Sequence, residues 1–306
     1  MKTQSYHLYL SPKTKFLNFF RRFFIFSGLD KLLAHFTRNG KMDSLTAKLV
    51  PPNYLYSPGT FRKCSINGIN FLLDISETNG HSNYYSLSEP AEELLFSNIK
   101  EGMTIIDIGA NIGAITLKSA KKVGLPGKVF SFEPSPINFK RASTNISLNK
   151  FTNITLINQG LGNEKSTAFL YNVNPNNRGM LRLLQDDVQN NSFEKEEVEI
   201  DTLDSSMQKF SIAKPDFIKI DVEGFEYKVL QGAHETLSKF KPILFIELVD
   251  NNLREQKSNA KELIQYLKLL NYKIINAQSN DEIDENSDFT NCHFDILCTA
   301  TTHFQL

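Results

Sequence analysis

The sequence predicts an α/β fold in which helices cover both faces of a doubly wound, mostly parallel β-sheet. From residue 103 onward, short apolar runs alternate with segments of helical character, as expected when parallel strands are joined by helices. A glycine-containing turn follows the first run, and an acidic residue ends the second. The apolar runs that we expect to be parallel strands are residues 104–108, 129–132, 154–157, 217–220 and 243–247.

The connecting segments complete this pattern. Residues 112–123, 136–149 and 225–240 have helical character, and a further helix is expected at about 258–270. Residues 272–276 and 293–299 then read as two closing strands, the final one antiparallel. The polar stretch 172–197 has no pattern that predicts its structure.

Residues 1–57 are expected to form an N-terminal helical arm, and residues 58–306 the main domain. On a helical wheel, the phenylalanines at 16, 19, 20 and 23 share one arc. Asn18, Arg21 and Arg22 lie on the opposite side. Two interpretations are open. The arm packs on the main domain through its apolar arc, or it lies on a membrane surface as an amphipathic segment.

A hairpin is predicted after this arm. Asn67 and Gly68 stand between two alternating runs, and this pair suits the tight turn in which both central residues take a positive φ.

Composition excludes several classes of protein. The 306 residues carry 34 Lys and Arg against 34 Asp and Glu, so charge offers no general reason to bind nucleic acid. Three cysteines, odd in number and dispersed, favour reduced thiols over a disulfide framework. No apolar run is long enough to cross a bilayer, so we expect a cytoplasmic protein, with peripheral membrane contact through the arm as the alternative.

The turn after the first core strand contains Asp107, Gly109, Asn111 and Gly113. Gly109 permits a sharp turn, and Gly113 permits close approach of helix, ligand and sheet. The spacing is not that of the dinucleotide motif. A pyrophosphate favours positive surroundings, whereas a sulfonium cofactor tolerates a carboxylate such as Asp107. This argument favours S-adenosylmethionine over NAD.

Two polar residues follow the next two strands. Glu133 lies 20 residues after Gly113 and is predicted to accept hydrogen bonds from both ribose hydroxyls. Gln159 follows the third strand, where polar groups are expected near the adenine; a simple turn remains the other interpretation.

Asp221 and Glu223 are the predicted catalytic residues. They follow the fourth strand, and ligands of open α/β sheets bind outside the carboxyl ends of the strands. Asp221 could instead cap the next helix, a role compatible with catalysis.

Taken together, these motifs resemble the FkbM family of methyltransferases. The resemblance rests on residues 107–113, 132–136, 202–204 and 218–224, with Asn138, Asn145, Glu226 and Glu247, and spans about residues 60–250. It implies a Rossmann-like methyltransferase sheet and methyl transfer from S-adenosylmethionine, usually to a hydroxyl of a sugar or natural product. By position, Asp107, Gly109, Asn111, Gly113 and Glu133 would hold the cofactor, and Asp221 and Glu223 would lie at the methyl-transfer centre.

Other functions remain open at this stage. An NAD-dependent oxidoreductase and a non-catalytic binding protein share the predicted architecture, while a nucleic-acid methyltransferase conflicts with the neutral charge. No metal site is expected. Cys292, His293 and Cys298 lie close in sequence, but alternation along a strand turns His293 away from the two thiols.

Overall fold

The computed structural model describes residues 10–37, 45–86, 90–172, 181–183 and 195–301. The chain divides into two compact units, Met1–Ser88 and Glu89–Leu306. The division expected from the sequence, between residues 57 and 58, falls inside the first unit. The reason is that the predicted hairpin belongs to this unit, where α4 (Thr78–Tyr85) contacts both the hairpin strand β2 (Ile69–Asp74) and α2 (Ser27–Thr37).

The first unit is mainly helical and contains one hairpin. Strand β1 (Phe61–Ile66) pairs with β2 in antiparallel fashion, and Asn67 and Gly68 at the turn have φ angles of 48° and 75°. The predicted turn is therefore confirmed. The other elements of this unit are α1 (Pro12–Arg21), the 3₁₀ helix η2 (Arg22–Ile25), α3 (Leu45–Leu49) and η3 (Asn53–Leu55).

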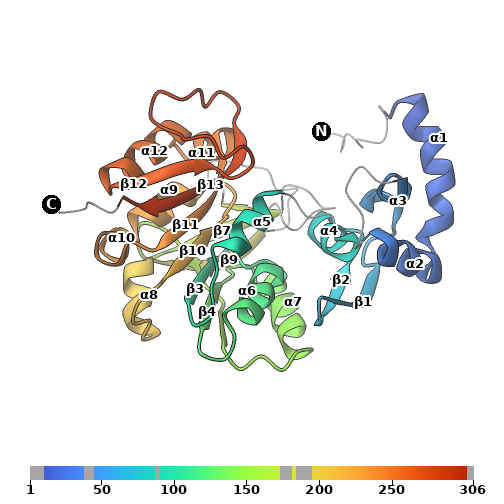
Figure 1. The fold of residues 1–306 in the computed structure, drawn as a ribbon, viewed down its shortest axis with the longest axis horizontal. Coiled ribbons are helices and arrows are strands. Elements are labelled where there is room, and N and C mark those ends of the chain that lie inside the picture. The colour runs from blue at the N-terminus through green and yellow to red at the C-terminus, as the bar shows by residue number, and fades with distance from the viewer. Residues whose placement is uncertain (1–9, 38–44, 87–89, 173–180, 184–194, 302–306) are drawn as a thin grey trace. The chain divides into compact units, whose positions relative to one another are not determined.

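The second unit is built on a seven-stranded sheet with the order β12-β13-β11-β10-β3-β4-β5 (Figure 1). Neighbouring strands from β11 to β5 are parallel, and β13 is antiparallel to both of its neighbours. The predicted doubly wound, mostly parallel sheet with an antiparallel final strand is confirmed. The strands are β3 (Thr104–Ile108), β4 (Lys128–Phe132), β5 (Ile154–Ile157), β10 (Phe217–Ile220), β11 (Ile243–Val249), β12 (Tyr272–Asn276) and β13 (His293–Ala300).

Successive residues of the central strands enter two separate hydrophobic cores. Ile106 and Ile218 belong to the core that also contains residues of α8, α9, α10 and α12. Ile105 and Phe217, one position earlier, belong to the core shared with α5 and α6. Because side chains alternate across a strand, both faces of the sheet must be apolar, which explains the continuous apolar runs in the sequence.

The helices of this unit include one interruption that the sequence pattern did not indicate. Residues 225–240 form two helices, α9 (Glu226–Gln231) and α10 (His234–Phe240), because the chain breaks at Gly232. A Cβ at Gly232 would lie 1.9 Å from the carbonyl oxygen of Gly162. The remaining helices are α5 (Pro90–Ser97), α6 (Ala114–Val123), α7 (Pro136–Ser147), α8 (Leu203–Lys209), α11 (Asp250–Glu255) and α12 (Ala260–Leu269).

A second, four-stranded sheet was not predicted. Its order is β6-β9-β7-β8, from β6 (Gly160–Leu161), β7 (Ser166–Asn172), β8 (Leu181–Leu183) and β9 (Lys195–Asp201). Leu170, Leu181, Val198 and Ile200 form its small hydrophobic core. Most of the polar stretch 172–197 lies outside the described residues, and the pairing of β7 with β9 bridges it.

Candidate active site

The candidate site lies where the strand order of the large sheet reverses. β3 and β10 are adjacent, and the chain proceeds outward from β3 to β4 in one direction and from β10 to β11 in the other. Ligands of such sheets bind at this point, in the crevice outside the carboxyl ends of the strands. The glycine turn follows β3, and Asp221 follows β10.

The glycine turn depends on backbone conformations that few residues adopt. Gly109 and Gly113 have φ angles of +85° and +80°, and Asn111 has a φ of 50°. Asparagine is one of the few side chains that tolerates this left-handed region. A Cβ at Gly109 would lie only 1.9 Å from the backbone oxygen of Asp221, so glycine allows the two loops to approach each other.

The backbone amides of this turn already have partners within the protein. The N–H groups of Gly109 and Ala110 both donate to the carbonyl of Phe132, at 3.0 Å each, and that of Gly113 donates to Ala110 O at 2.8 Å. The N–H of Asn111 donates to Oε2 of Glu133 at 2.7 Å. These four amides do not form the array of free donors by which a glycine loop binds a pyrophosphate.

Glu133 is a nearly buried carboxylate directly after β4. Its Oε2 accepts from Asn111 N, and its Oε1 accepts from Ser135 N at 2.9 Å. Burial raises the pKa of Glu133 to about 7, although both amide hydrogen bonds act in the opposite direction. Each carboxylate oxygen has a second lone pair, so Glu133 can still accept hydrogen bonds from a ligand. Its predicted role with the ribose hydroxyls remains a prediction.

Lys219, which the sequence analysis did not assign to the site, connects the two loops. Its buried Nζ lies 3.1 Å from Oδ2 of Asp221 and 3.8 Å from Oδ1 of Asp107, and it donates to the carbonyl of Gly109 at 3.2 Å. Burial opposes the charge on Lys219, but the nearby carboxylates outweigh it and raise the pKa of the amine. The signal in the sequence was a lysine within an otherwise apolar strand, which needs a partner when buried.

Asp107 does not face the crevice. Its side chain is fully buried on β3, where Oδ2 accepts a 2.6 Å hydrogen bond from the hydroxyl of Thr116. With no exposed surface, Asp107 would influence a cofactor through Lys219 and the glycine turn. Direct contact with the cofactor, as expected from the sequence, remains a prediction that this burial does not favour.

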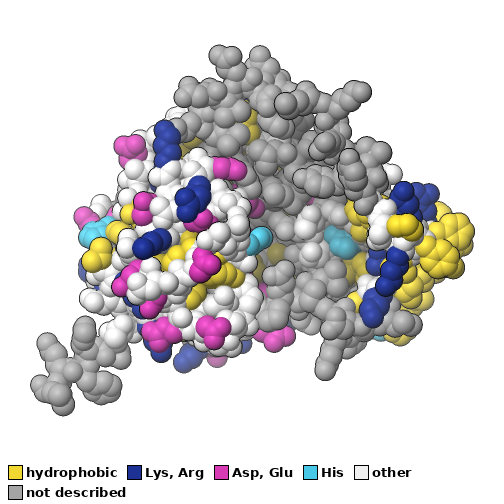
Figure 2. Space-filling view, turned by 90° about the horizontal axis from the view of Figure 1, so that it is seen from above, with side chains coloured by type: hydrophobic (Ala, Val, Ile, Leu, Met, Phe, Trp, Pro, Cys, Tyr) yellow, Lys and Arg dark blue, Asp and Glu magenta, His cyan; other side chains and the backbone are white. Residues whose placement is uncertain are grey.

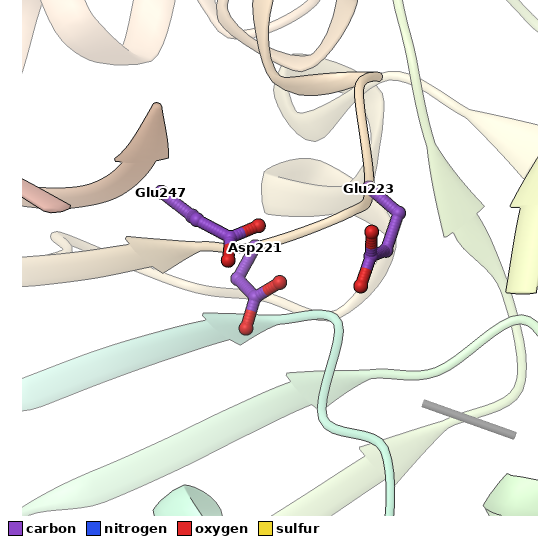
Figure 3. A group of neighbouring side chains, drawn as sticks. All are labelled: Asp221, Glu223 and Glu247. Atoms are coloured by element: carbon purple, nitrogen blue, oxygen red, sulfur yellow. The ribbon is translucent and has the colours of Figure 1, made fainter. Parts of the chain in front are cut away.

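Three carboxylates converge at the carboxyl edge (Figure 3). Asp221 and Glu223 follow β10, Glu247 lies on the neighbouring strand β11, and one oxygen of each lies within 4.8 Å of the others. Burial raises the pKa of Glu247 above its ordinary value, and the charges of Asp221 and Glu223 raise it further. Glu247 therefore holds its proton more tightly than an ordinary glutamate, and in the protonated form its side chain is a hydrogen-bond donor beside two acceptors.

Hydrogen bonds hold the backbone after β10 in the conformation that places Asp221 and Glu223 at the carboxyl edge. Glu223 has a φ of 54°, unusual for a residue with a side chain, and its Oε2 accepts from Asn252 Nδ2 at 3.1 Å. The buried Glu226 accepts from the N–H groups of Val222 and Gly224, both at 3.0 Å. Glu226 thus has a structural function in positioning Asp221 and Glu223.

A small hollow of 290 Å³ lies beside the carboxylate cluster. Its lining is largely polar and consists of Glu247, Gln278, His293, Phe294 and Asp295. His293 Nε2 lies 3.5 Å from Oε1 of Glu247, and Gln278 Nε2 donates to Oδ2 of Asp295 at 3.2 Å. Its volume is close to the lower limit for pockets that bind small molecules.

Gln159, between β5 and β6, is buried and has an unusual feature. Its Oε1 has no hydrogen-bond partner among the described residues. Other buried side-chain atoms among the described residues, such as Ser119 Oγ and Ser206 Oγ, share this feature, so it does not by itself mark a ligand contact. An adenine amino group could donate to this oxygen, and the role of Gln159 at the adenine remains a prediction.

Comparison with known proteins identifies the family. The family model described as the methyltransferase FkbM domain matches residues 107–274, more than half of the chain. The chain belongs to the FkbM methyltransferase family. The matched range includes the glycine turn, Glu133, Asp221, Glu223 and Glu247.

Individual relatives are more distant. The methyltransferase sdnD of Sordaria araneosa is 25% identical over 189 residues, which cover 50% of this chain and 73% of that protein. A solved FkbM methyltransferase from Methylobacillus flagellatus is 17% identical with a TM-score of 0.44; the match covers 88% of this chain but only 57% of that one. A SAM-dependent methyltransferase from Aquifex aeolicus is 15% identical with a TM-score of 0.38, over 72% of this chain and 98% of that one.

The cofactor of this FkbM methyltransferase domain is S-adenosylmethionine, and the chemistry of the site fits it. Asp221, Glu223 and Glu247 place carboxylates at this edge of the sheet, and Asp107 and Asp221 offset the charge of the buried Lys219. Such surroundings suit a cationic sulfonium and disfavour a pyrophosphate. Glu133 and Gln159 remain the predicted acceptors for the ribose and the adenine, and the paired amides of the glycine turn argue against NAD.

No metal site was expected from the sequence, but the structure brings three carboxylates close together. Among the described residues, Asp221, Glu223 and Glu247 are the group whose spacing suits a cation. The sequence neighbours Cys292, His293 and Cys298 do not form such a group: Cys298 is fully buried, whereas the side chain of His293 is 72% exposed. The raised pKa of Glu247, which favours its uncharged form, and the charge of Lys219 both act to reduce the negative charge of the acidic group.

Proposed function

We propose that this methyltransferase transfers a methyl group to a hydroxyl of a sugar or a polyhydroxylated natural product. The observation that carries the proposal is the convergence of Asp221, Glu223 and Glu247 (Figure 3). Glu247 also lines the polar hollow. Carboxylates accept hydrogen bonds from hydroxyl groups, and an alcohol reacts as a nucleophile only when its proton is removed during attack.

Asp221 is the residue that we propose to orient or deprotonate the acceptor. Its side chain is 42% exposed, and Lys219 lies 3.1 Å from its Oδ2, so the carboxylate is held at one oxygen while part of it remains accessible to an acceptor. Glu223 is held by Asn252 on the same edge and is the alternative base. When bound, S-adenosylmethionine supplies an electrophilic methyl group on a good leaving group, so the protein mainly has to align the acceptor oxygen with it.

The 290 Å³ hollow supports an acceptor with several hydroxyl groups. Glu247, Gln278, His293 and Asp295 offer both donors and acceptors at its wall, while Phe294 adds an apolar surface. A sugar ring presents the same mixture, with hydroxyls around its edge and C–H groups on its faces. Strands β11 and β13 place Glu247 directly opposite Asp295, so the sheet register positions this wall.

The test is incubation of the full chain with methyl-labelled S-adenosylmethionine and a panel of monosaccharides, oligosaccharides and hydroxylated natural products. The same panel includes amine and carboxylic acid acceptors as controls. We expect label in an ether-linked methyl of a hydroxylated acceptor. Methylation of only amines or acids would refute the proposed acceptor class while leaving the family assignment intact. Binding of S-adenosylhomocysteine without transfer to any acceptor class would favour a non-catalytic binding protein.

A further inference from the structure

Helix α1 packs on the protein through its polar face, whereas an amphipathic helix commonly packs through its apolar face. On α1, the buried residue is Asn18, whose Nδ2 donates to the hydroxyl of Tyr54 at 3.0 Å. Arg21 donates to the carbonyl of Lys48 at 2.9 Å and to Oδ1 of Asn18 at 3.1 Å. The polar face of α1 therefore packs on the rest of the first unit, and its apolar face is turned outward.

This arrangement leaves an exposed apolar surface, here called the Phe face. Phe16, Phe19 and Phe26 are 68%, 64% and 65% exposed. Among the described residues, eight of the twelve exposed large hydrophobic side chains fall between residues 16 and 36. Such concentration marks an interaction surface, because folded proteins seldom expose contiguous apolar area without a partner. The Phe face comprises Phe16, Phe19, Phe20, Phe23, Phe26, Leu29, Leu32 and Phe36.

The charges around the Phe face are positive. Lys13, Lys15, Arg22 and Lys31 are exposed on the same helices. The single acid between residues 10 and 37, Asp30, is buried and paired with Arg62 at 2.7 Å. Figure 2 shows yellow hydrophobic side chains beside dark-blue basic ones at the right-hand edge of the molecule.

A hollow of 450 Å³ adjoins this surface. Its lining combines the basic side chains of Lys15 and Arg22 with the apolar side chains of Leu10, Phe19 and Leu55 and with Tyr54. Arg22 directly follows α1 and lies seven residues, about two helical turns, after Lys15. The ammonium group of Lys15 and the guanidinium group of Arg22 therefore lie along the same side. A phosphate beside an acyl chain matches this combination of charge and apolar surface.

We propose that the Phe face binds the surface of a membrane containing anionic phospholipids. Phenylalanine and leucine side chains enter the boundary between headgroups and acyl chains, and the surrounding Lys and Arg side chains contact lipid phosphates. A second copy of the chain is a poorer occupant, because it would bring two sets of basic residues together. No helix of the described part of the chain is long and apolar enough to cross a bilayer, so the proposed contact is peripheral.

The test is flotation of the full chain with vesicles of phosphatidylcholine alone or with about one third phosphatidylglycerol. We expect strong flotation with the anionic vesicles, reduced by salt, and little with phosphatidylcholine. The triple variant Phe16→Ser, Phe19→Ser and Phe23→Ser should lose at least about tenfold in partitioning. Because these side chains are exposed, its unfolding transition should match that of the wild type.

Two further variants make the test specific. A triple variant that reverses the basic charges should abolish the preference for anionic vesicles; it combines Lys13→Glu, Lys15→Glu and Arg22→Glu. Leu125→Ser with Leu269→Ser removes two hydrophobic side chains of the second unit, 83% and 81% exposed, and should leave flotation unchanged. Equal flotation of the Phe variant and the wild type would overturn the proposal. So would a wild-type dimer, detected by light scattering, that becomes monomeric in the Phe variant while neither protein binds vesicles.

Discussion

The Nζ of Lys219 lies 3.1 Å from Oδ2 of Asp221, and this contact joins the sheet core to the candidate catalytic edge. The same ammonium neutralises the fully buried Asp107 from 3.8 Å. A charge buried to this extent is tolerated because it has two oppositely charged neighbours and a backbone acceptor.

We therefore expect Lys219→Met to destabilise the fold strongly. The change leaves Asp107 buried without its cation, which typically costs about 3–5 kcal/mol. Urea unfolding at neutral pH, followed by circular dichroism, measures the loss. The control is Lys214→Met, since Lys214 is exposed and its pairing with Asp216 at 3.3 Å should contribute less than about 1 kcal/mol. Adding Asp107→Asn to Lys219→Met should restore part of the stability; strictly additive losses would show that the two residues do not act as a pair.

Asp221→Asn should reduce kcat about 10²- to 10⁴-fold, because the amide cannot accept the proton of the acceptor hydroxyl. Affinity for S-adenosylhomocysteine should change only a few-fold, since the amide retains the shape of the side chain. Labelled methyl transfer and calorimetry measure the two quantities. Near-normal turnover would remove Asp221 from the mechanism and point to Glu223.

Glu247→Gln should reduce turnover much less than Asp221→Asn does. The pKa of Glu247 is raised by burial and by Asp221 and Glu223, which favours the protonated side chain, and glutamine resembles that form. We expect turnover within about threefold of the wild type, whereas Glu247→Ala, which removes the donor, should raise KM for the acceptor more than it lowers kcat. If Gln and Ala have the same effect, the hydrogen bond of Glu247 has no role in acceptor binding.

Binding of S-adenosylhomocysteine should depend on pH through Glu133. Its pKa is raised to about 7, so raising the pH through this value converts it from the acid to the carboxylate that we predict to accept both ribose hydroxyls. Affinity should therefore increase from about pH 6 to about pH 8. Calorimetry on Glu133→Gln should show weaker binding with this increase removed. An unchanged affinity in Glu133→Ala would contradict the whole assignment of the cofactor pocket.

Gly109→Ala should destabilise the protein much more than Gly102→Ala. Both glycines have a positive φ, +85° and +81°, and differ in their surroundings. A Cβ at Gly102 meets nothing within 4 Å, so the cost is the conformational one of about 1–2 kcal/mol. At Gly109 the Cβ would collide with the Asp221 carbonyl, which should add about 2 kcal/mol or more and weaken cofactor binding. If both variants lower the temperature of unfolding equally, the loops after β3 and β10 can separate without a cost in stability.

Much of this protein could be predicted from local patterns. The parallel strands are buried on both faces, so each appears as a short apolar run, and the positive φ at Asn67, Gly68, Gly109 and Gly113 requires residue types that the sequence displays. The order of these signals predicted the sheet, and with it the edge at which Glu133, Asp221 and Glu223 lie.

Contacts between distant residues were decided only by the tertiary structure. Register between β3 and β10 pairs Lys219 with Asp107, and register between β11 and β13 builds the polar wall at Glu247 and Asp295. The four-stranded sheet depends on β7 pairing with β9 across a long polar stretch, for which no local pattern exists. Likewise, the arc of phenylalanines revealed an amphipathic helix but not which face packs on the protein. Periodicity records which side chains share a side, whereas the direction in which that side points depends on long-range partners such as Tyr54 and Lys48.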